Sequence, residues 1–74
     1  METEKIQFWV DLIEKTLIAE QDKDTVNHLN KLREMLPLKA GDDQYLIHEI
    51  CGCIGIQDRK LARRMFEMLK RRIL

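Results

Sequence analysis

Apolar residues recur at intervals of three and four along most of this chain, and this spacing constrains the fold more than any other feature. Near the N-terminus, five of them share one side of a predicted helix: Ile6, Trp9, Val10, Ile13 and Leu17. No run alternates apolar and polar residues, as a half-buried strand would. Leu and Ile supply 18 of the 74 residues, whereas Val supplies only two. The pattern therefore predicts an all-α protein with a single domain over residues 1–74.

Four short helices are expected, and their ends are marked by residues that cap or stop helices. The expected bounds are Thr3 or Glu4 to Glu20, Thr25 to Leu36, Gln44 to about Cys53, and Gln57 or Asp58 to the C-terminus. Caps are expected from the segment Asp22–Asp24, from Asp42 or Asp43, and from Asp58. Pro37 ends the second helix and opens a linker over 37–42 with Gly41 as its pivot. Gly52 and Gly55 separate the third helix from the fourth.

The first helix carries a second apolar stripe on another side, formed by Phe8, Leu12 and Ala19. A helix that is apolar on two sides is usually covered on two sides. In so small a domain, the second cover is expected to be another subunit or a partner protein. Residues 1–36 are therefore predicted to form a helical hairpin that makes a homodimer. The expected interface residues are Phe8, Trp9, Leu12, Leu29 and Leu32.

Charge is divided unevenly along the chain. Residues 1–50 carry eleven acidic and six basic side chains, a balance of −5, and residues 51–74 carry two acidic and seven basic ones, a balance of +5. Six of the basic residues form the candidate nucleic-acid surface on the fourth helix: Arg59, Lys60, Arg63, Arg64, Lys70 and Arg71. Glu67 is expected to pair with Arg63 or Arg71. The asymmetry indicates DNA as a partner; the alternative is that the two halves neutralise each other within the fold or a dimer.

Residues 43–74 also fit a helix-turn-helix unit. That motif needs a small residue where its two helices cross, a short turn with Gly, and an apolar edge that docks the second helix. The sequence supplies these in order: Ile47, Ile50 and Ile54 for the buried side, Cys51 for the crossing, Gly55 and Ile56 for the turn, and Leu61 and Met65 for the docking edge.

Within residues 44–69, this pattern resembles the Fis-type helix-turn-helix DNA-binding domain. The same type of domain forms the C-terminal part of the enhancer-binding transcriptional activators. The matching positions are Cys51, Gly55, Ile56, Leu61, Arg63, Arg64 and Met65. The resemblance implies two helices that dimerise, followed by two that bind DNA, with the last helix in the major groove. It also implies a regulatory protein in which some arginines read base edges and others contact phosphates.

Three other functions are alternatives to DNA binding. An adaptor, chaperone or inhibitor would bind a partner protein through the two-sided first helix, while the basic helix meets an acidic patch on that partner. The spacing H-x-x-C-x-C of His48, Cys51 and Cys53 would suit a metal site. A structural zinc ion is usually held by four ligands, however, so inert buried cysteines are favoured. The basic fourth helix also suits an anionic membrane surface, but its apolar side is needed to close the core.

Several functional classes are excluded by what the sequence lacks. It contains no serine, no P-loop, no GxGxxG and no HExxH, so neither an enzyme nor a cofactor or metal is expected. No apolar run approaches the roughly 18 residues of a membrane span. The first residues do not form a secretory signal. A cytoplasmic protein with reduced thiols is therefore expected.

Overall fold

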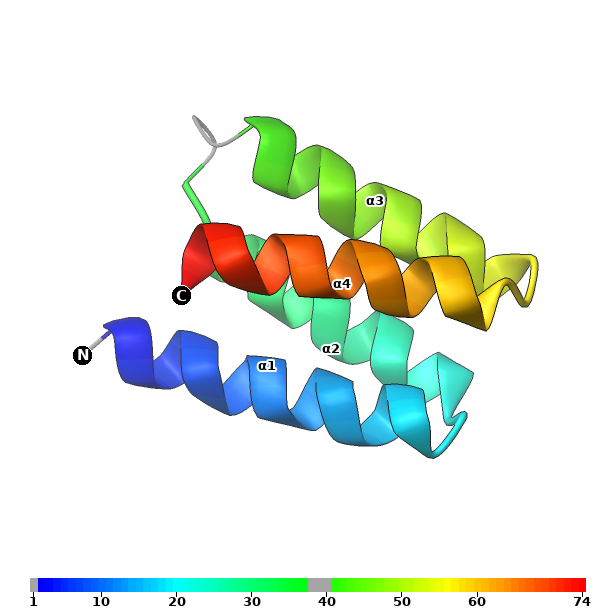
Figure 1. The fold of residues 1–74 in the computed structure, drawn as a ribbon. Helices are drawn as coiled ribbons and strands as arrows, with labels where there is room; N and C mark the ends of the chain where they lie inside the picture. The colour runs from blue at the N-terminus through cyan, green and yellow to red at the C-terminus, as the bar shows by residue number, and fades with distance from the viewer. Residues whose placement is uncertain (1, 38–40) are drawn as a thin grey trace.

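The computed structural model describes residues 2–37 and 41–74, and within them the chain is helical with no strand, which confirms the all-α prediction. Four helices follow one another: α1 (Glu2–Ile18), α2 (Asp22–Met35), α3 (Gly41–Gly55) and α4 (Arg59–Ile73). Successive helices run in opposite directions, so the start of α1 and the end of α4 lie at the same end of the bundle (Figure 1). Of the linker expected over 37–42, residues 38–40 lie outside the described residues.

Two of the expected caps are wrong, because the helices begin earlier than predicted. α2 begins at Asp22 itself, after Gln21, whose side chain makes no capping hydrogen bond. α3 begins at Gly41, so Asp42 and Asp43 lie within its first turn rather than before it. Carboxylates in a first turn still interact favourably with the helix dipole. The side chains of Asp22 and Asp43 are thereby left to accept hydrogen bonds from another helix.

The turn between α3 and α4 is short, and Asp58 caps α4 as predicted. Its side chain accepts a hydrogen bond from the backbone N–H of Leu61, at 3.2 Å. The backbone of Gln57 has a φ of 62°, a left-handed conformation that reverses the chain direction after α3. Gly52 does not interrupt the chain as expected, because it lies inside α3, which ends at Gly55.

The core is built from apolar side chains of all four helices. Its largest fully buried members are Phe66, Ile13, Leu29, Leu32, Ile47, Ile50 and Leu69. Leu29 and Leu32 are 0% exposed, so the prediction that they belong to an interface is wrong. α2 packs against both α1 and α3, and the fold itself covers these two leucines.

α4 docks on the rest of the bundle through Ala62, Phe66 and Leu69, which are at most 2% exposed. Of the docking edge expected from the sequence, Met65 does pack against the core and contacts Cys53 of α3, and the prediction is wrong only for Leu61. Leu61 is 38% exposed, and Met65 is only partly buried. The buried stripe lies one residue further along the helix because α4 contacts α1 as well as α3, and a stripe centred on Phe66 can face both.

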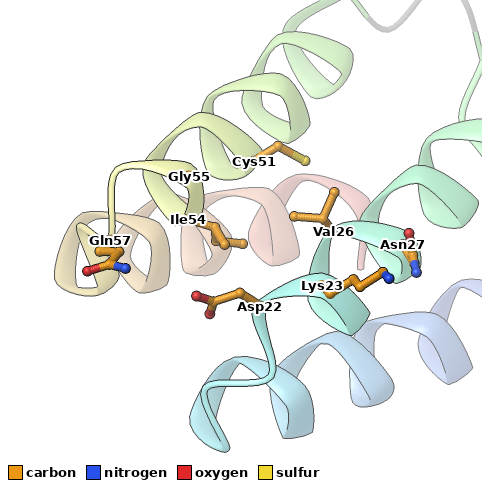
Figure 2. Close-up of a pocket in the computed structure, with 8 residues that line it drawn as sticks. All are labelled: Asp22, Lys23, Val26, Asn27, Cys51, Ile54, Gly55 and Gln57. Carbon is orange, nitrogen blue, oxygen red and sulfur yellow. The ribbon is translucent and has the colours of Figure 1, made fainter.

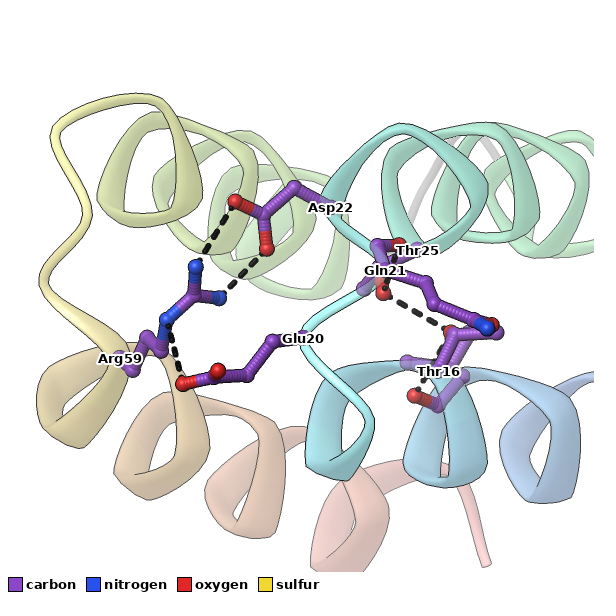
Figure 3. A network of polar contacts seen from close by, with 7 residues as sticks. Thr16, Glu20, Gln21, Asp22, Thr25 and Arg59 are labelled. Atoms are coloured by element: carbon purple, nitrogen blue, oxygen red, sulfur yellow. Dashed lines mark hydrogen bonds and ion pairs between the residues drawn. The ribbon is translucent and has the colours of Figure 1, made fainter.

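Polar side chains join three helices where α1 turns into α2 (Figure 3). Arg59, at the start of α4, pairs with both oxygens of the Asp22 carboxylate, and its Nε lies 3.2 Å from Glu20. The hydroxyl oxygens of Thr16 and Thr25 lie 2.8 Å apart in the interior. Each hydroxyl also lies within hydrogen-bond distance of a backbone carbonyl, Thr16 of Leu12 and Thr25 of Gln21, so both buried groups are satisfied.

Acid should weaken the contact between Asp22 and Arg59. The hydrogen bonds from Arg59 lower the pKa of the Asp22 carboxyl below its ordinary value. The stabilisation is therefore complete above the ordinary pKa of about 3.9 and is lost as pH falls through the lower folded value. We expect the free energy of unfolding to fall below about pH 4, and to fall less in Asp22→Asn. Urea unfolding followed by circular dichroism measures this; identical acid dependence in both proteins would contradict it.

Truncation of a core leucine and of an exposed aromatic residue should have very different effects. Leu32→Ala should lower the free energy of unfolding by about 2–5 kcal/mol, because it opens a cavity in the core. Phe8→Ala should lower it by less than about 1 kcal/mol, since the Phe8 side chain is 57% exposed. Urea denaturation at low protein concentration compares the two, and a similar loss in both variants would argue against this core.

Candidate interaction surface

Three basic side chains of α4 each bind an acid on a different helix. The pairs are Lys70 with Glu14 of α1, Arg59 with Asp22 of α2, and Arg72 with Asp43 of α3. In each case the hydrogen bond to the acid raises the pKa of the cation. Arg59 and Lys70, two of the six residues predicted to bind nucleic acid, are therefore engaged within the fold. The positive charges of these two residues are therefore neutralised by acids from the first half of the chain, which is the alternative that the sequence left open.

The other four predicted residues form no ion pair within the described part of the chain: Lys60, Arg63, Arg64 and Arg71. All four are exposed, and we call them the basic row. At about 100° per residue, Lys60, Arg64 and Arg71 lie on the side of α4 that faces away from Phe66, whereas Arg63 lies on the flank towards α1, where it borders a pocket with Phe66 and Leu17. Glu67 lies among them but pairs with Lys70 at 2.9 Å, so its predicted pairing with Arg63 or Arg71 is wrong. The surface of α4 therefore offers four exposed cations without an ion pair among the described residues, three on its outer side and Arg63 on the flank towards α1.

Exposed apolar side chains lie directly beside the basic row. Leu61 is 38% exposed and Met68 is 48% exposed. They are seven positions apart, which places them two turns apart on one side of the helix. Arg64 comes three residues after Leu61 and four before Met68, so its aliphatic stem neighbours both. The surface of α4 is therefore a mixed one, in which cations and apolar groups alternate.

The structure does not confirm the helix-turn-helix arrangement of α3 and α4. The end of α4 contacts the start of α3, where Arg72 pairs with Asp43, and the middle of α4 contacts the last turns of α3, where the sulfur of Met65 lies 3.9 Å from that of Cys53. The helices of a helix-turn-helix diverge from their turn at about 90–120°, which would separate their far ends. α3 and α4 instead form an antiparallel hairpin (Figure 1). α4 therefore packs along α3 rather than projecting from it.

The two cysteines face different neighbours of α3. Cys53 is 5% exposed and contacts Met65 of α4, whereas Cys51 is half-buried and faces α2. The thiol at the contact between α3 and α4 is thus Cys53, and the expected place of Cys51 at that crossing is wrong. Burial raises the pKa of both thiols, which favours their neutral, unreactive form.

A groove of about 400 Å³ separates the start of α2 from the end of α3 (Figure 2). Val26 and Ile54 give it an apolar wall, and Cys51 lies at its side. Asp22 also lines it, but its carboxylate is already held by Arg59. Within residues 2–37 and 41–74, no three His, Cys, Asp or Glu side chains gather closely enough to hold a metal ion. The groove is therefore a weaker candidate for a site than the basic row.

Of the remaining predicted interface residues, Phe8 and Leu12 lie on the outer side of α1, whereas Trp9 packs against the edge of the core. Phe8 is exposed, and Trp9 and Leu12 are partly exposed. The Trp9 ring packs edge-on against Phe8, with centroids 5.4 Å apart, and lies tilted against His28. The second apolar stripe of this helix is therefore left uncovered by the described residues.

Sequence reasoning missed the role of Arg72, which is not among the six basic residues of the candidate nucleic-acid surface. Arg72 pairs with buried Asp43 and lies 3.6 Å from Asp42. A signal for this contact was present in the sequence. Two adjacent acids begin the third predicted helix and basic residues end the fourth, and an antiparallel arrangement brings these two helix ends together.

No protein family model, curated protein or solved structure matches this chain. Among the described helices, none has both the length and the apolar character that crossing a membrane requires. The function must therefore be inferred from the two uncovered surfaces, the basic row with its apolar neighbours on α4 and the apolar stripe on α1.

The native thiols should react slowly. Because burial raises the pKa of both Cys51 and Cys53, we expect a chromogenic disulfide reagent to modify them much more slowly than it modifies free cysteine at neutral pH. Cys51 should react first, since it is half-buried whereas Cys53 is buried. The same assay in urea serves as the control. Rapid reaction of the folded protein would contradict the burial of these side chains.

Proposed function

We propose that the protein is a small helical adaptor that binds an acidic, amphipathic segment of a partner protein on the outer side of α4. The observation that carries the proposal is the position of the basic row directly beside exposed Leu61 and Met68. A segment with carboxylates next to apolar side chains would match both features at once.

The dimensions of this surface suit a short helical segment. The basic row extends from Lys60 to Arg71, which corresponds to about 16 Å of helix or three turns. Three of its four cations are arginines, whose planar guanidinium groups pair with carboxylates in a bidentate manner. The neighbouring apolar side chains would supply the burial that surface ion pairs alone do not provide.

The internal ion pairs explain why the basic row remains available. Arg59, Lys70 and Arg72 use the acids that face α4 from the other three helices. Removal of charges from the basic row should therefore leave the fold intact. The positive charges of the basic row are therefore better explained by binding to a partner than by a contribution to the stability of the fold.

Duplex DNA is the second candidate partner, and the four cations of the basic row favour it as well. Phosphates would accept hydrogen bonds from the same side chains and release counterions on binding. The apolar groups of Leu61 and Met68 have no counterpart in phosphate contacts, and α4 packs along α3 instead of projecting into a groove. For these reasons DNA binding by a regulatory protein is placed second.

Two double variants separate the candidates. Arg63→Glu/Arg64→Glu reverses charge in the basic row, and Leu61→Ala/Met68→Ala removes its apolar neighbours. Lys23→Glu/Lys31→Glu makes the same charge change on α2 and is the matched control. Each variant is checked for helicity by circular dichroism. Binding is then measured to labelled duplex DNA at low and high salt, and to partner proteins recovered by affinity capture and identified by mass spectrometry.

We expect a protein with an acidic segment to bind the wild type and the control, and to bind both test variants at least roughly tenfold more weakly. DNA binding would give a different result, since affinity would fall steeply with salt and would be lost only in the charge variant. Tight, salt-sensitive DNA binding that survives loss of Leu61 and Met68 would therefore overturn the adaptor proposal in favour of DNA.

A further inference from the structure

The outer side of α1 presents a fixed apolar ridge with no cover in the described fold. Phe8 is 57% exposed, and Leu12, one turn later, is partly exposed. The ring of Phe8 stands edge-on against Trp9, which in turn packs against His28. Phe8 is therefore held in place before any partner arrives, which lowers the entropic cost of burying it.

Two opposite charges border this ridge. Glu4 lies one turn before Phe8, and Lys15 lies three residues after Leu12. Both are exposed, and neither forms an ion pair with a described residue. At about 100° per residue, Glu4 and Lys15 lie within about 20° of each other, on the same flank of α1. They are about 16 Å apart along the helix, too far to pair within one chain.

We propose that a second copy of this chain docks on this ridge, with the two α1 helices antiparallel about a two-fold axis midway between Phe8 and Leu12. The order Glu4, Phe8, Leu12, Lys15 is self-complementary when it is reversed. Phe8 then meets the partner's Leu12, and Glu4 meets the partner's Lys15. A two-fold interface requires such matching, because every contact occurs twice with the roles exchanged.

The flank geometry supports the same arrangement. In an antiparallel two-fold pair of helices, each flank meets the same flank of the partner, so Glu4 and Lys15 must share one flank, as they do. An unrelated partner would place no such requirement on the order of charges. The inference stands independently of the adaptor proposal, because it uses α1 and leaves the outer side of α4 free.

The two-fold axis also brings together one unfavourable pair. Asp11 lies close to the axis on the flank of Glu4 and Lys15, so the two copies of Asp11 approach each other. Within one chain its carboxylate accepts a hydrogen bond from the Gln7 side chain, at 2.9 Å. Removing the charge of Asp11 should therefore strengthen the dimer. Neutralising an acidic residue far from the axis would not have this effect.

Sedimentation equilibrium of the full chain over a wide concentration range tests the proposal. We expect a monomer–dimer equilibrium that Glu4→Lys and Lys15→Glu each weaken roughly tenfold, since each breaks two ion pairs and creates two repulsions. The double variant Glu4→Lys/Lys15→Glu should restore the wild-type dissociation constant. Phe8→Ala should weaken the dimer by at least roughly tenfold, and Asp11→Asn should strengthen it.

Three results would overturn the proposal. The first is a monomer at every concentration, the second is a dimer that the single charge reversals leave unchanged, and the third is a double variant that is no tighter than either single one. The single variant Lys23→Glu, which changes the net charge by as much as Lys15→Glu does, controls for net charge, and circular dichroism confirms that each protein is folded. Because the readout is self-association, failure here leaves partner binding by α4 to be judged by its own variants.

Discussion

The position of α4 depends on three ion pairs, one to each of the other helices. Lys70, Arg59 and Arg72 reach α1, α2 and α3 respectively. Apolar burial around Phe66 supplies most of the stabilisation, and the three pairs add contacts that match only one rotation of α4 against its neighbours. They also decide which cations of α4 remain outside. The fold and the candidate surface are in this sense set by the same contacts.

The parts of the fold that depend on local sequence could be predicted. The number and order of helices follow from the apolar spacing, and the cap at Asp58 follows from the sequence around it. The starts of α2 and α3 could not be predicted in this way. Asp22 and Asp43 look like caps from the sequence, but both lie inside helices, where they bind arginines that are distant along the chain.

The candidate surface was predictable only in part, for a related reason. A helical projection groups the basic residues of α4, but it cannot show that Arg59 and Lys70 find acids on other helices. It also cannot show which part of the broad apolar side faces the core: Leu61 and Ala62 both belong to that side, but Leu61 is 38% exposed and Ala62 is 0% exposed. Both distinctions depend on the rotation of α4 against two neighbours at once, and that rotation is a property of the tertiary structure.

The alternating direction of the four helices has a consequence for how the chain reaches its fold. The most extensive contacts join α1 to α2 and α3 to α4, which are neighbours in sequence, whereas those between α1 and α4 are far fewer. Closing such contacts costs little chain entropy, because short turns connect the elements that pack. Topologies of this kind fold on the microsecond to millisecond timescale. The two hairpins can therefore form early, and the long-range pair between Lys70 and Glu14 would close the bundle last.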